Sequence, residues 1–311
     1  MNILILGAGA MGSLLGARLS GTDASISLFS IDREHMEAIG QDGLLVEELD
    51  GTVRNYPLAA YFDPVMLPPN PELVLVMVKA YATAAAVSSV LPLCSPSTVF
   101  LTLQNGIGNW ERIAEITGKD AVLAGSTAQG ATLFEPGKIR HGGNGPTYIG
   151  EPDGPASERV HRVAAIFKKA GLVTELSDHM ERLIWEKLVV NVGINAITAL
   201  TGIRNGVIAE MQEASALCAS AVEEAILVAR AKGFPIGLDM IDRVLSVAGA
   251  TARNRSSMGQ DVDKRKRTEI GAINGAIVEF GKQAGIPTPV NQTLTSLIKI
   301  LEKQNLKEKG R

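Results

Sequence analysis

The sequence predicts an α/β domain with a Rossmann-type, doubly wound parallel sheet at residues 1–177, followed by an all-helical domain at residues 178–311. Short apolar, β-branched runs alternate with helical segments over about the first 150 residues, which is typical of a parallel sheet covered by helices on both faces. From about His179 onward the segments show helical periodicity instead. A length of 311 residues suits about two domains of ordinary size.

The expected strands are short runs rich in Val, Ile and Leu. They lie at residues 2–7, 25–30, 72–79, 98–106 and 121–127. Helical spacing follows the first strand, and residues 33–43 are predicted to form a helix closed by glycine. Residues 131–151 combine turn residues with alternation, so we expect antiparallel edge strands there. The helical domain is expected to begin near Ser177 and Asp178, the latter as a helix N-cap, with helices at residues 178–202, 211–233, 238–251 and 267–285.

Composition argues against several classes of protein. The formal net charge is -3, and the longest basic run, at residues 264–267, is flanked by acids, so nothing favours a nucleic-acid partner. No uninterrupted apolar run reaches the roughly 18 residues of a membrane span, so no membrane partner is expected. Two isolated cysteines and four scattered histidines show neither disulfide nor metal-ligand spacing, which predicts no metal and a cytoplasmic location.

The run GAGAMG at residues 7–12 has the G-x-G-x-x-G spacing of dinucleotide-binding proteins. In that motif Gly7 permits the tight turn from strand to helix, Gly9 lets the backbone approach a pyrophosphate, and Gly12 lets the helix pack closely. The N–H groups and positive dipole end of the helix then hold the phosphates. A strand before the glycines and a helix after them favour dinucleotide binding over a merely structural turn. The predicted cofactor-binding residues here are Gly7, Ala8, Gly9, Ala10, Met11 and Gly12.

The segment after the second expected strand leaves the choice of cofactor open. Asp32 lies twenty residues past the last glycine of the motif, where an acid would hydrogen-bond the ribose 2′-hydroxyl of NAD. Its neighbour Arg33, together with Ser30, could instead meet the 2′-phosphate of NADP. A third interpretation is a turn that only caps a helix. Lys79 and Asn105 each end an apolar strand, and ligands of doubly wound sheets lie outside the carboxyl ends of the strands, so both are expected at the same crevice.

The segment LIWEKLVVNVGINAITAL, residues 183–200, is nearly all apolar but carries Lys187, Asn191 and Asn195 at intervals of four. On a helix such residues form one stripe, about 12 Å long at a rise of about 1.5 Å per residue. An unpaired buried amide costs about 1–3 kcal/mol, and a buried ammonium costs more unless it is partnered. The stripe is therefore tolerable along a wet cleft that holds a polar ligand, or where it hydrogen-bonds neighbouring helices, and its spacing fits both.

Further motifs give this stripe a context. WEKLVVNVGINAIT, RNGV at residues 204–207, NRSSMGQDV at residues 254–262 and RTEIGAING at residues 267–275 resemble the ketopantoate reductase family. The glycine motif, the lysine that ends the third main strand and QNG extend the resemblance from end to end of the chain. The resemblance implies a C-terminal domain like that of 6-phosphogluconate dehydrogenase. It also implies reduction of 2-dehydropantoate to pantoate with NADPH, in pantothenate biosynthesis.

The resemblance assigns roles to individual residues. The family's catalytic lysine matches Lys187, and its paired glutamate matches Glu269. The positions near the nicotinamide match Lys79 and Asn105, the latter also close to the substrate. The remaining substrate-binding positions match Asn191, Asn195, Asn205, Asn254 and Ser257. Members that use NADPH commonly carry an arginine where this chain has Asp32, with Arg33 one place later, so the family implies NADP(H) while Asp32 keeps NAD(H) open.

A lysine ammonium suits this chemistry. When a hydride reaches a C2 carbonyl, the developing alkoxide needs charge stabilisation and a proton, and Lys187 can supply both if burial lowers its pKa. Glu269 would orient Lys187 or the substrate hydroxyl, while the amides and Ser257 would bind hydroxyl and carboxylate oxygens. Two alternatives stay open: a related reductase of another small 2-oxo acid, and a dinucleotide-sensing binding protein, against which Lys187 and Glu269 argue. The helical domain also has enough apolar length to support a homodimer interface.

Overall fold

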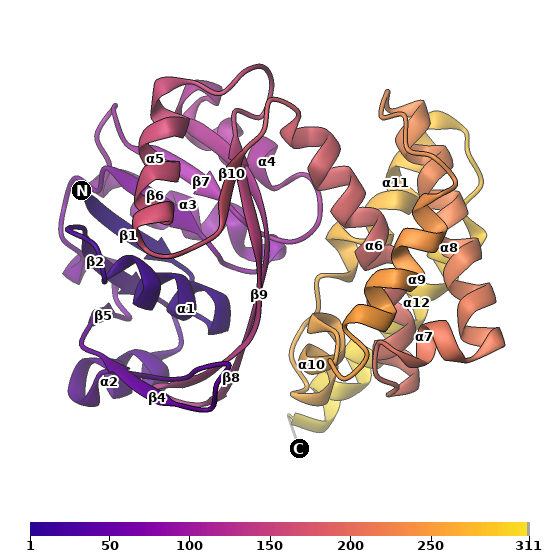
Figure 1. Cartoon of the computed structure of the whole chain (residues 1–311), viewed down its shortest axis with the longest axis horizontal. Helices are drawn as coiled ribbons and strands as arrows, with labels where there is room; N and C mark the ends of the chain where they lie inside the picture. Colours follow the sequence, from indigo (N-terminus) through magenta and orange to yellow (C-terminus); the bar gives the residue numbers. More distant parts are fainter. Residues whose placement is uncertain (310–311) are drawn as a thin grey trace. The chain divides into compact units, whose positions relative to one another are not determined.

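The computed structural model describes residues 1–309, and its contacts divide the chain into two compact units (Figure 1). Unit 1 comprises Met1–Gln104 and Gly108–Glu181, and unit 2 comprises Asn105–Ile107 and Arg182–Arg311. Unit 1 contains the expected sheet and unit 2 the expected helices. The boundary was predicted between residues 177 and 178, but by their contacts residues 178–181 cluster with unit 1 and Asn105–Ile107 with unit 2. That the two units are separate domains stays a prediction.

Unit 1 is built on one mixed sheet of ten strands within residues 1–309. The strands are β1 (Asn2–Leu6), β2 (Ser25–Phe29), β3 (Leu44–Glu47), β4 (Val53–Tyr56), β5 (Ala59–Tyr61), β6 (Leu73–Val76), β7 (Val99–Thr102), β8 (Val122–Glu135), β9 (Lys138–Gly150) and β10 (Thr174–Leu176). Their order is β4-β3-β9-β8-β7-β6-β1-β2-β5, with β10 pairing β9. The run from β8 through β7, β6, β1 and β2 to β5 is parallel throughout, which confirms the predicted class of fold.

The part of the sheet beyond β7 differs from the prediction in detail. The expected strand at residues 121–127 and the start of the alternating segment at residues 131–151 form one long strand, β8. The rest of that segment forms β9, which pairs with β8 in the expected antiparallel fashion. Register shifts at three places along this pair let the long strands bend. The hairpin of β3 and β4 was not expected, because the side chains of β4 are mostly exposed and give little apolar alternation.

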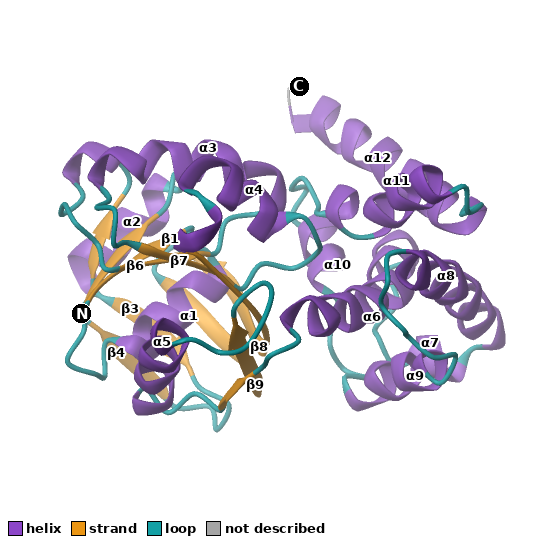
Figure 2. Cartoon of the chain, turned by 90° about the horizontal axis from the view of Figure 1, so that it is seen from above, coloured by secondary structure: helices purple, strands orange, loops and turns teal. Residues whose placement is uncertain are grey.

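Helices cover both faces of this sheet, as Figure 2 shows for α3 and α4 on one face and α1 and α5 on the other. The helices of unit 1 are α1 (Ala10–Leu19), α2 (Arg33–Asp42), α3 (Thr83–Val90), α4 (Asn109–Thr117) and α5 (Glu158–Lys169). Alternate residues of β1 supply two separate cores. Ile3 and Ile5 pack with α1 and α5, while Leu4 and Leu6 pack with α3 and α4. A strand buried on both faces explains why its sequence is continuously apolar.

Unit 2 is helical and has one hydrophobic core. Its helices are α6 (Met180–Thr201), which begins in unit 1, α7 (Val207–Glu210), α8 (Gln212–Ala231), α9 (Met240–Ala250), α10 (Ser257–Asp263), α11 (Asn274–Ala284) and α12 (Pro289–Lys309). Val189 and Val192 of α6 join Ala225 of α8, Val244 of α9 and Ile277 of α11 in that core. α6 is long and apolar enough to span a membrane by length and composition, yet 61% of its most apolar window is buried inside the protein.

One expected helix begins later than predicted. The prediction placed a helix over residues 267–285, but α11 begins at Asn274. Ile273 leaves the helical conformation at φ -112° and ψ -100°, and the residues before it form a short 3-10 turn, η5 (Ile270–Ala272). Glu269 stands at the N-cap of that turn rather than inside a helix. This break sets the position of a predicted catalytic residue.

Candidate active site

The glycine loop between β1 and α1 has the geometry that its sequence predicts. Gly7 adopts φ +105°, and a Cβ there would lie 2.4 Å from the backbone nitrogen of Val78. A Cβ on Gly12 would lie 2.3 Å from the carbonyl oxygen of Gly7, so α1 packs directly on the loop. By contrast, nothing lies within 4 Å of a Cβ built on Gly9. The backbone is therefore open at the position where a phosphate is expected to approach.

The start of α1 suits an anionic ligand. Gly9 is its N-cap and provides no side-chain cap, and the first turn carries no acidic residue. The first N–H groups of a helix lack intrahelical partners and sit at the positive end of its dipole. The N–H groups of Gly7 and Ala8 both donate to the carbonyl oxygen of Phe29 at 2.9 Å, which ties the loop to the end of β2. These features fit the phosphates of a dinucleotide.

The segment at the end of β2 combines a helix cap with exposed charge. The Asp32 carboxylate accepts a hydrogen bond from the His35 N–H at 3.3 Å and so caps α2, while its own N–H donates to Ser30 Oγ at 3.1 Å. The next residue, Arg33, pairs with Glu37 at 2.7 Å. Asp32 and Arg33 are both exposed. The capping interpretation is thus realised, and it uses one of the two carboxylate oxygens of Asp32.

The Arg33 guanidinium is also engaged on one face. It lies 4.6 Å from the centroid of the Phe62 ring, which follows β5. Stacking on the aromatic ring and pairing with Glu37 together restrict the rotation of this guanidinium. The negative charge of Glu37 therefore offsets part of the positive charge of Arg33.

The predicted residues at the ends of β6 and β7 belong to different units. Lys79 lies three residues past the end of β6, is half-buried and forms the N-cap of a 3-10 turn, η2 (Ala80–Ala82). Asn105 is half-buried and belongs by its contacts to unit 2. Between them in the chain stands Gln104, which the sequence did not single out. Its Nε2 donates to the Val78 carbonyl at 2.6 Å and to Thr83 Oγ1 at 2.9 Å, so it fastens the two strand ends together.

The polar stripe of α6 lies as its spacing predicts, with half-buried Lys187 and Asn191 and with Asn195 only 4% exposed. The side-chain nitrogens of Asn191 and Asn195 are buried, and neither makes a hydrogen bond to any residue in the described range 1–309. A stripe that only joined neighbouring helices would use these donors. Two adjacent buried amides without partners therefore favour a polar ligand along α6.

Lys187 has the electrostatic setting of a proton donor. Burial lowers the pKa of its ammonium from 10.5 to about 8, and the negative charge of Glu269 opposes part of that shift. Glu269 is 7% exposed, so its carboxylate acts from within the helical unit and not from bulk solvent. The predicted catalytic pair is thus close enough in space to interact, although 82 residues separate the two in the chain. Such a shifted group, paired with a specific charge, is typical of functional sites.

The remaining predicted substrate residues come from the loops after α6 and α9. Asn205 is 8% exposed and donates from Nδ2 to Thr251 Oγ1 at 3.0 Å, while its Oδ1 is buried without a partner among residues 1–309. The Asn205 N–H donates to the carbonyl oxygen of Asn254 at 3.1 Å, which links two of the predicted residues directly. The Asn254 side chain is exposed.

The two serines of NRSSM have different tasks. Ser256 is buried, caps α10 by accepting from the Gly259 N–H at 3.0 Å, and accepts from Thr198 Oγ1 at 2.7 Å. Ser257, the predicted substrate-binding residue, is exposed at the first position of α10. One serine therefore builds the loop, and its neighbour has a hydroxyl available to a ligand.

Sequence reasoning missed the arginine that holds this loop in place. Arg255 donates to the carbonyl oxygens of Thr198 and Ile203, at the end of α6 and just beyond it. It also pairs with Asp263, whose carboxylate is 2.9 Å away. A residue that reaches back 57 positions to a main-chain carbonyl leaves no local pattern, so the sequence offers no signal for it.

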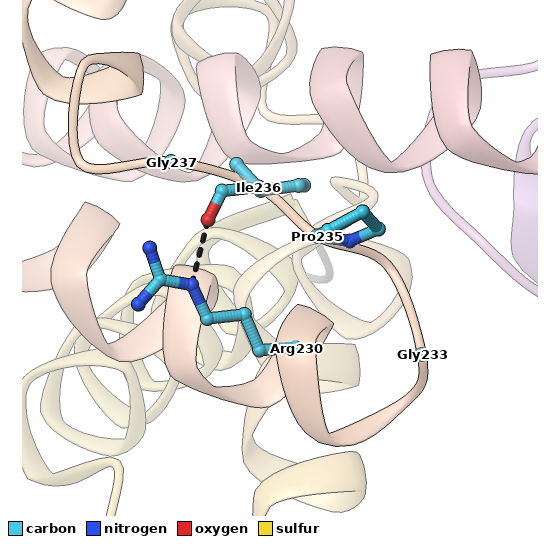
Figure 3. A pocket seen from close by; sticks show the side chains of 5 residues that line it. All are labelled: Arg230, Gly233, Pro235, Ile236 and Gly237. Carbon is cyan, nitrogen blue, oxygen red and sulfur yellow. Dashed lines mark hydrogen bonds between the residues drawn. The ribbon is translucent and has the colours of Figure 1, made fainter.

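An open pocket of about 290 Å³ also lies in unit 2, and none of the predicted residues lines it. It is lined by Arg230, Gly233, Pro235, Ile236 and Gly237, where the chain turns from α8 towards α9 (Figure 3). Arg230 Nε donates to the Ile236 carbonyl at 2.7 Å and closes this turn.

Among residues 1–309, no three His, Cys, Asp or Glu side chains gather as a metal site.

Comparison with known proteins agrees with this geometry. A family described as ketopantoate reductase PanE/ApbA matches residues 3–154, and one described as ketopantoate reductase PanE/ApbA C terminal matches residues 179–302. The 2-dehydropantoate 2-reductase of Halobacterium salinarum is 39% identical over 303 residues, which cover 97% of this chain and 99% of that protein.

Solved structures are similar over nearly the whole chain. A PanE/ApbA family ketopantoate reductase from Ralstonia eutropha gives a TM-score of 0.90 at 30% identity, covering 98% of this chain and 100% of that one. D-mandelate dehydrogenase in a ternary structure with NADH and anilino(oxo)acetate gives a TM-score of 0.91 at 25% identity, covering 98% of this chain and 99% of that one.

Proposed function

The chain belongs to the ketopantoate reductase family, and we propose that it reduces 2-dehydropantoate to pantoate with a reduced nicotinamide dinucleotide. Both parts of the family match, and relatives named 2-dehydropantoate 2-reductase are similar over the full chain. The observation that carries the proposal is the setting of Lys187. It is an ammonium with a lowered pKa, influenced by Glu269 and aligned with two amides whose donors have no partner within residues 1–309.

The protein's own groups account for the proton transfer. The bound nicotinamide supplies a hydride to the C2 carbonyl of the substrate. As negative charge develops on the carbonyl oxygen, the Lys187 ammonium stabilises it and then donates a proton to it. A pKa of about 8 brings this acid close to neutral pH, where proton donation is most effective. The Glu269 carboxylate keeps enough of Lys187 protonated to act, because its charge favours the ammonium form.

Neutral groups suit the recognition of this substrate. 2-Dehydropantoate carries a carboxylate, an oxo group and a hydroxyl, which are all oxygens that accept hydrogen bonds. The unpartnered amide nitrogens of Asn191 and Asn195 can donate to them, and Asn254 and Ser257 are exposed and available. The unpartnered Oδ1 of Asn205 can accept from the substrate hydroxyl. An analogue without the hydroxyl would leave such groups unpaired, so selection against it is strong.

A steady-state assay on a panel of 2-oxo acids tests the function. The panel contains 2-dehydropantoate, 2-dehydropantoate's analogue without the hydroxyl, and phenylglyoxylate, the oxo acid that corresponds to mandelate. The last compound is included because the fold is also similar to D-mandelate dehydrogenase. The proposal expects the highest kcat/KM on 2-dehydropantoate. A higher value on phenylglyoxylate would favour the related-reductase alternative, and tight cofactor binding without any turnover would favour a sensor.

For the cofactor we infer a preference for NADH. The Asp32 carboxylate is exposed at the end of β2, where its negative charge would repel a 2′-phosphate. One of its oxygens caps α2, and the other can accept from a ribose hydroxyl. Arg33 would have to give up its pairing with Glu37 and Phe62 to bind a 2′-phosphate well. These contacts support NADH over the NADPH that the family resemblance implies.

Substitution of Asp32 tests that preference. In Asp32→Ala, we expect the dissociation constant of NADH to rise roughly tenfold, as expected for a lost hydrogen bond to a charged group, while NADPH binding is unchanged or tighter. The neighbouring variant Arg33→Ala is the control and is expected to change the ratio of the two affinities by less than about twofold. Fluorescence titration of both cofactors measures these constants. An equal weakening of NADH and NADPH in Asp32→Ala would mean that this carboxylate acts only as a cap.

Two further expectations stay predictions. A homodimer built on the helical part is supported by the apolar length of that part, and light scattering on the purified protein would measure its mass. A cytoplasmic location is supported by two cysteines without a disulfide spacing.

A further inference from the structure

A short loop of unit 2 lies directly against the segment that carries Glu269. The loop is Asn105–Ile107, which follows β7 in the chain but clusters with unit 2. The Ile107 N–H donates to the carbonyl oxygen of Ala272 at 3.1 Å. Ala272 ends η5, the turn whose N-cap is Glu269. A main-chain hydrogen bond therefore joins the residue directly after the QNG motif to a residue three positions from the predicted catalytic carboxylate.

Gly106 makes this approach as close as the backbone allows. Its φ is +85°, and a Cβ built on it would lie 2.6 Å from the Ala272 carbonyl oxygen and 2.8 Å from the Ala272 Cβ. Those distances are shorter than real side chains tolerate, so either the loop or η5 would have to move by several tenths of an ångström. The contact exists only because residue 106 has no side chain.

The segment of Glu269 has little freedom to yield to such a push. On one side, Thr268 donates from its N–H at 2.7 Å and from its hydroxyl at 2.6 Å to Glu302 of α12. On the other side, Asn274 Nδ2 donates to the Val192 carbonyl of α6 at 3.2 Å and to Asn291 Oδ1 at 2.9 Å. Both flanks are thus fixed to neighbouring helices. A displacement at Ala272 is taken up between these anchors, where Glu269 lies.

We propose that Gly106 is a positioning residue that sets Glu269 relative to Lys187 by seating the Asn105–Ile107 loop against Ala272. This role rests on the proposed function, because it concerns the pair that carries the proton. It also fixes the position of Asn105 relative to Glu269. The family resemblance puts Asn105 near both the nicotinamide and the substrate. The QNG motif then serves two purposes: its asparagine supplies a contact, and its glycine fixes the spacing of the catalytic pair.

The substitution Gly106→Ala tests the proposal. We expect kcat on 2-dehydropantoate to fall at least about tenfold, because misplacement of catalytic groups by about 1 Å can cost about 100-fold. We also expect the basic limb of the kcat–pH profile to move, since the charge of Glu269 raises the pKa of Lys187 and a changed distance between the two changes that effect. A residue needed only for folding would leave that limb in place, so the profile separates positioning from stability.

Gly108→Ala is the matched control. Gly108 has φ +86°, almost the same backbone strain, but nothing lies within 4 Å of the position that its Cβ would take. Gly108→Ala should lose only the stability that the backbone strain costs, should keep kcat within about twofold and should leave the basic limb unmoved, whereas Gly106→Ala carries the same strain and the clash with Ala272 as well. Ala272→Val adds bulk from the opposite side of the contact without touching a glycine. It should reproduce the kcat and pH effects of Gly106→Ala even if the latter folds poorly.

Three results would overturn the proposal: an unmoved basic limb in both Gly106→Ala and Ala272→Val, wild-type kcat in either of them, or an equal loss of kcat in Gly108→Ala. Failure of the wild type on 2-dehydropantoate would contradict the proposed function instead. The same variants would then be compared on the oxo acid that the wild type does reduce, so the two failures are distinguishable.

Discussion

Lys187 is an ammonium on a helix that otherwise supplies the hydrophobic core of unit 2. Burial disfavours its charged form, and the Glu269 carboxylate compensates in part, which leaves the pKa at about 8. A shift of one pKa unit corresponds to about 1.4 kcal/mol. The protein therefore gives up stability at this position, which is expected where function requires a strained or costly group.

The lowered pKa predicts a distinct pH dependence. Reduction needs the protonated lysine, so kcat should fall as pH rises above about 8, well below the 10.5 of an ordinary lysine. The reverse reaction, oxidation of pantoate, needs the neutral amine and should become faster over the same range. Steady-state rates in both directions between about pH 6 and about pH 10 would show opposite limbs. A forward rate that held constant over that whole range would assign the proton to another group.

The same residue predicts a pH-dependent stability. The folded state disfavours protonated Lys187, so the penalty is complete below about pH 8 and disappears as pH rises towards 10.5. Replacing the ammonium in Lys187→Met should therefore raise the free energy of unfolding near neutral pH by up to about 3 kcal/mol, and this advantage should shrink between pH 8 and pH 10.5. Urea denaturation of both proteins across that range measures it. A difference that does not change with pH would show that the lysine is not buried in its charged form.

At the scale of elements, α6 carries two buried amide nitrogens, those of Asn191 and Asn195, that have no partner among residues 1–309. Asn195 is 4% exposed and its Nδ2 has no partner among residues 1–309. Asn291 on α12 is fully buried too, but its Nδ2 donates to the Ala221 carbonyl at 3.0 Å and to Glu224 at 2.7 Å. The two buried asparagines thus differ in one respect: the side-chain nitrogen of Asn291 donates to the protein itself, and that of Asn195 does not.

Replacing each of these two asparagines by leucine separates binding from folding. Asn195→Leu removes an unpartnered amide, so we expect a loss of less than about 1 kcal/mol in stability but a fall of at least about tenfold in kcat/KM. Asn291→Leu removes the side-chain donor to Glu224 and leaves Asn274 Nδ2 without its acceptor Asn291 Oδ1, so it should destabilise the protein by about 2–4 kcal/mol. Chemical denaturation and steady-state kinetics on both variants measure the two quantities. Equal losses of stability would contradict a ligand-binding role for Asn195.

The elements also show how far the sequence could predict this structure. Continuous apolar runs located β1, β6 and β7, because strands buried on both faces have no polar alternation to blur the pattern. β4 escaped prediction because three of its four side chains are exposed. The start of α11 was misplaced, since the backbone of Ile273 breaks the helix in a stretch with good helical spacing. Local patterns identify elements well where burial is uniform and less well at their ends.

At the scale of the whole molecule, the site depends on contacts that no local pattern encodes. The stripe of α6 follows from a spacing of four, but the influence of Glu269 on Lys187 depends on how α6 and η5 pack. Arg255 reaches the end of α6 from a loop 57 residues away. The packing of Gly106 on Ala272 likewise joins segments far apart in the chain. The family resemblance predicts which residues form the site, and the structure supplies the contacts around them.

Lys187 is proposed to donate the proton in the reduction of 2-dehydropantoate, and one comparison of variants tests this role most directly. Turnover of that substrate is measured for the wild type, for Lys187→Ala and for Lys282→Ala, an exposed lysine of α11 that serves as the control. We predict that Lys187→Ala lowers kcat by several orders of magnitude, that its cofactor dissociation constant stays close to the wild-type value, and that Lys282→Ala behaves as the wild type. Near-normal turnover in Lys187→Ala would contradict the account.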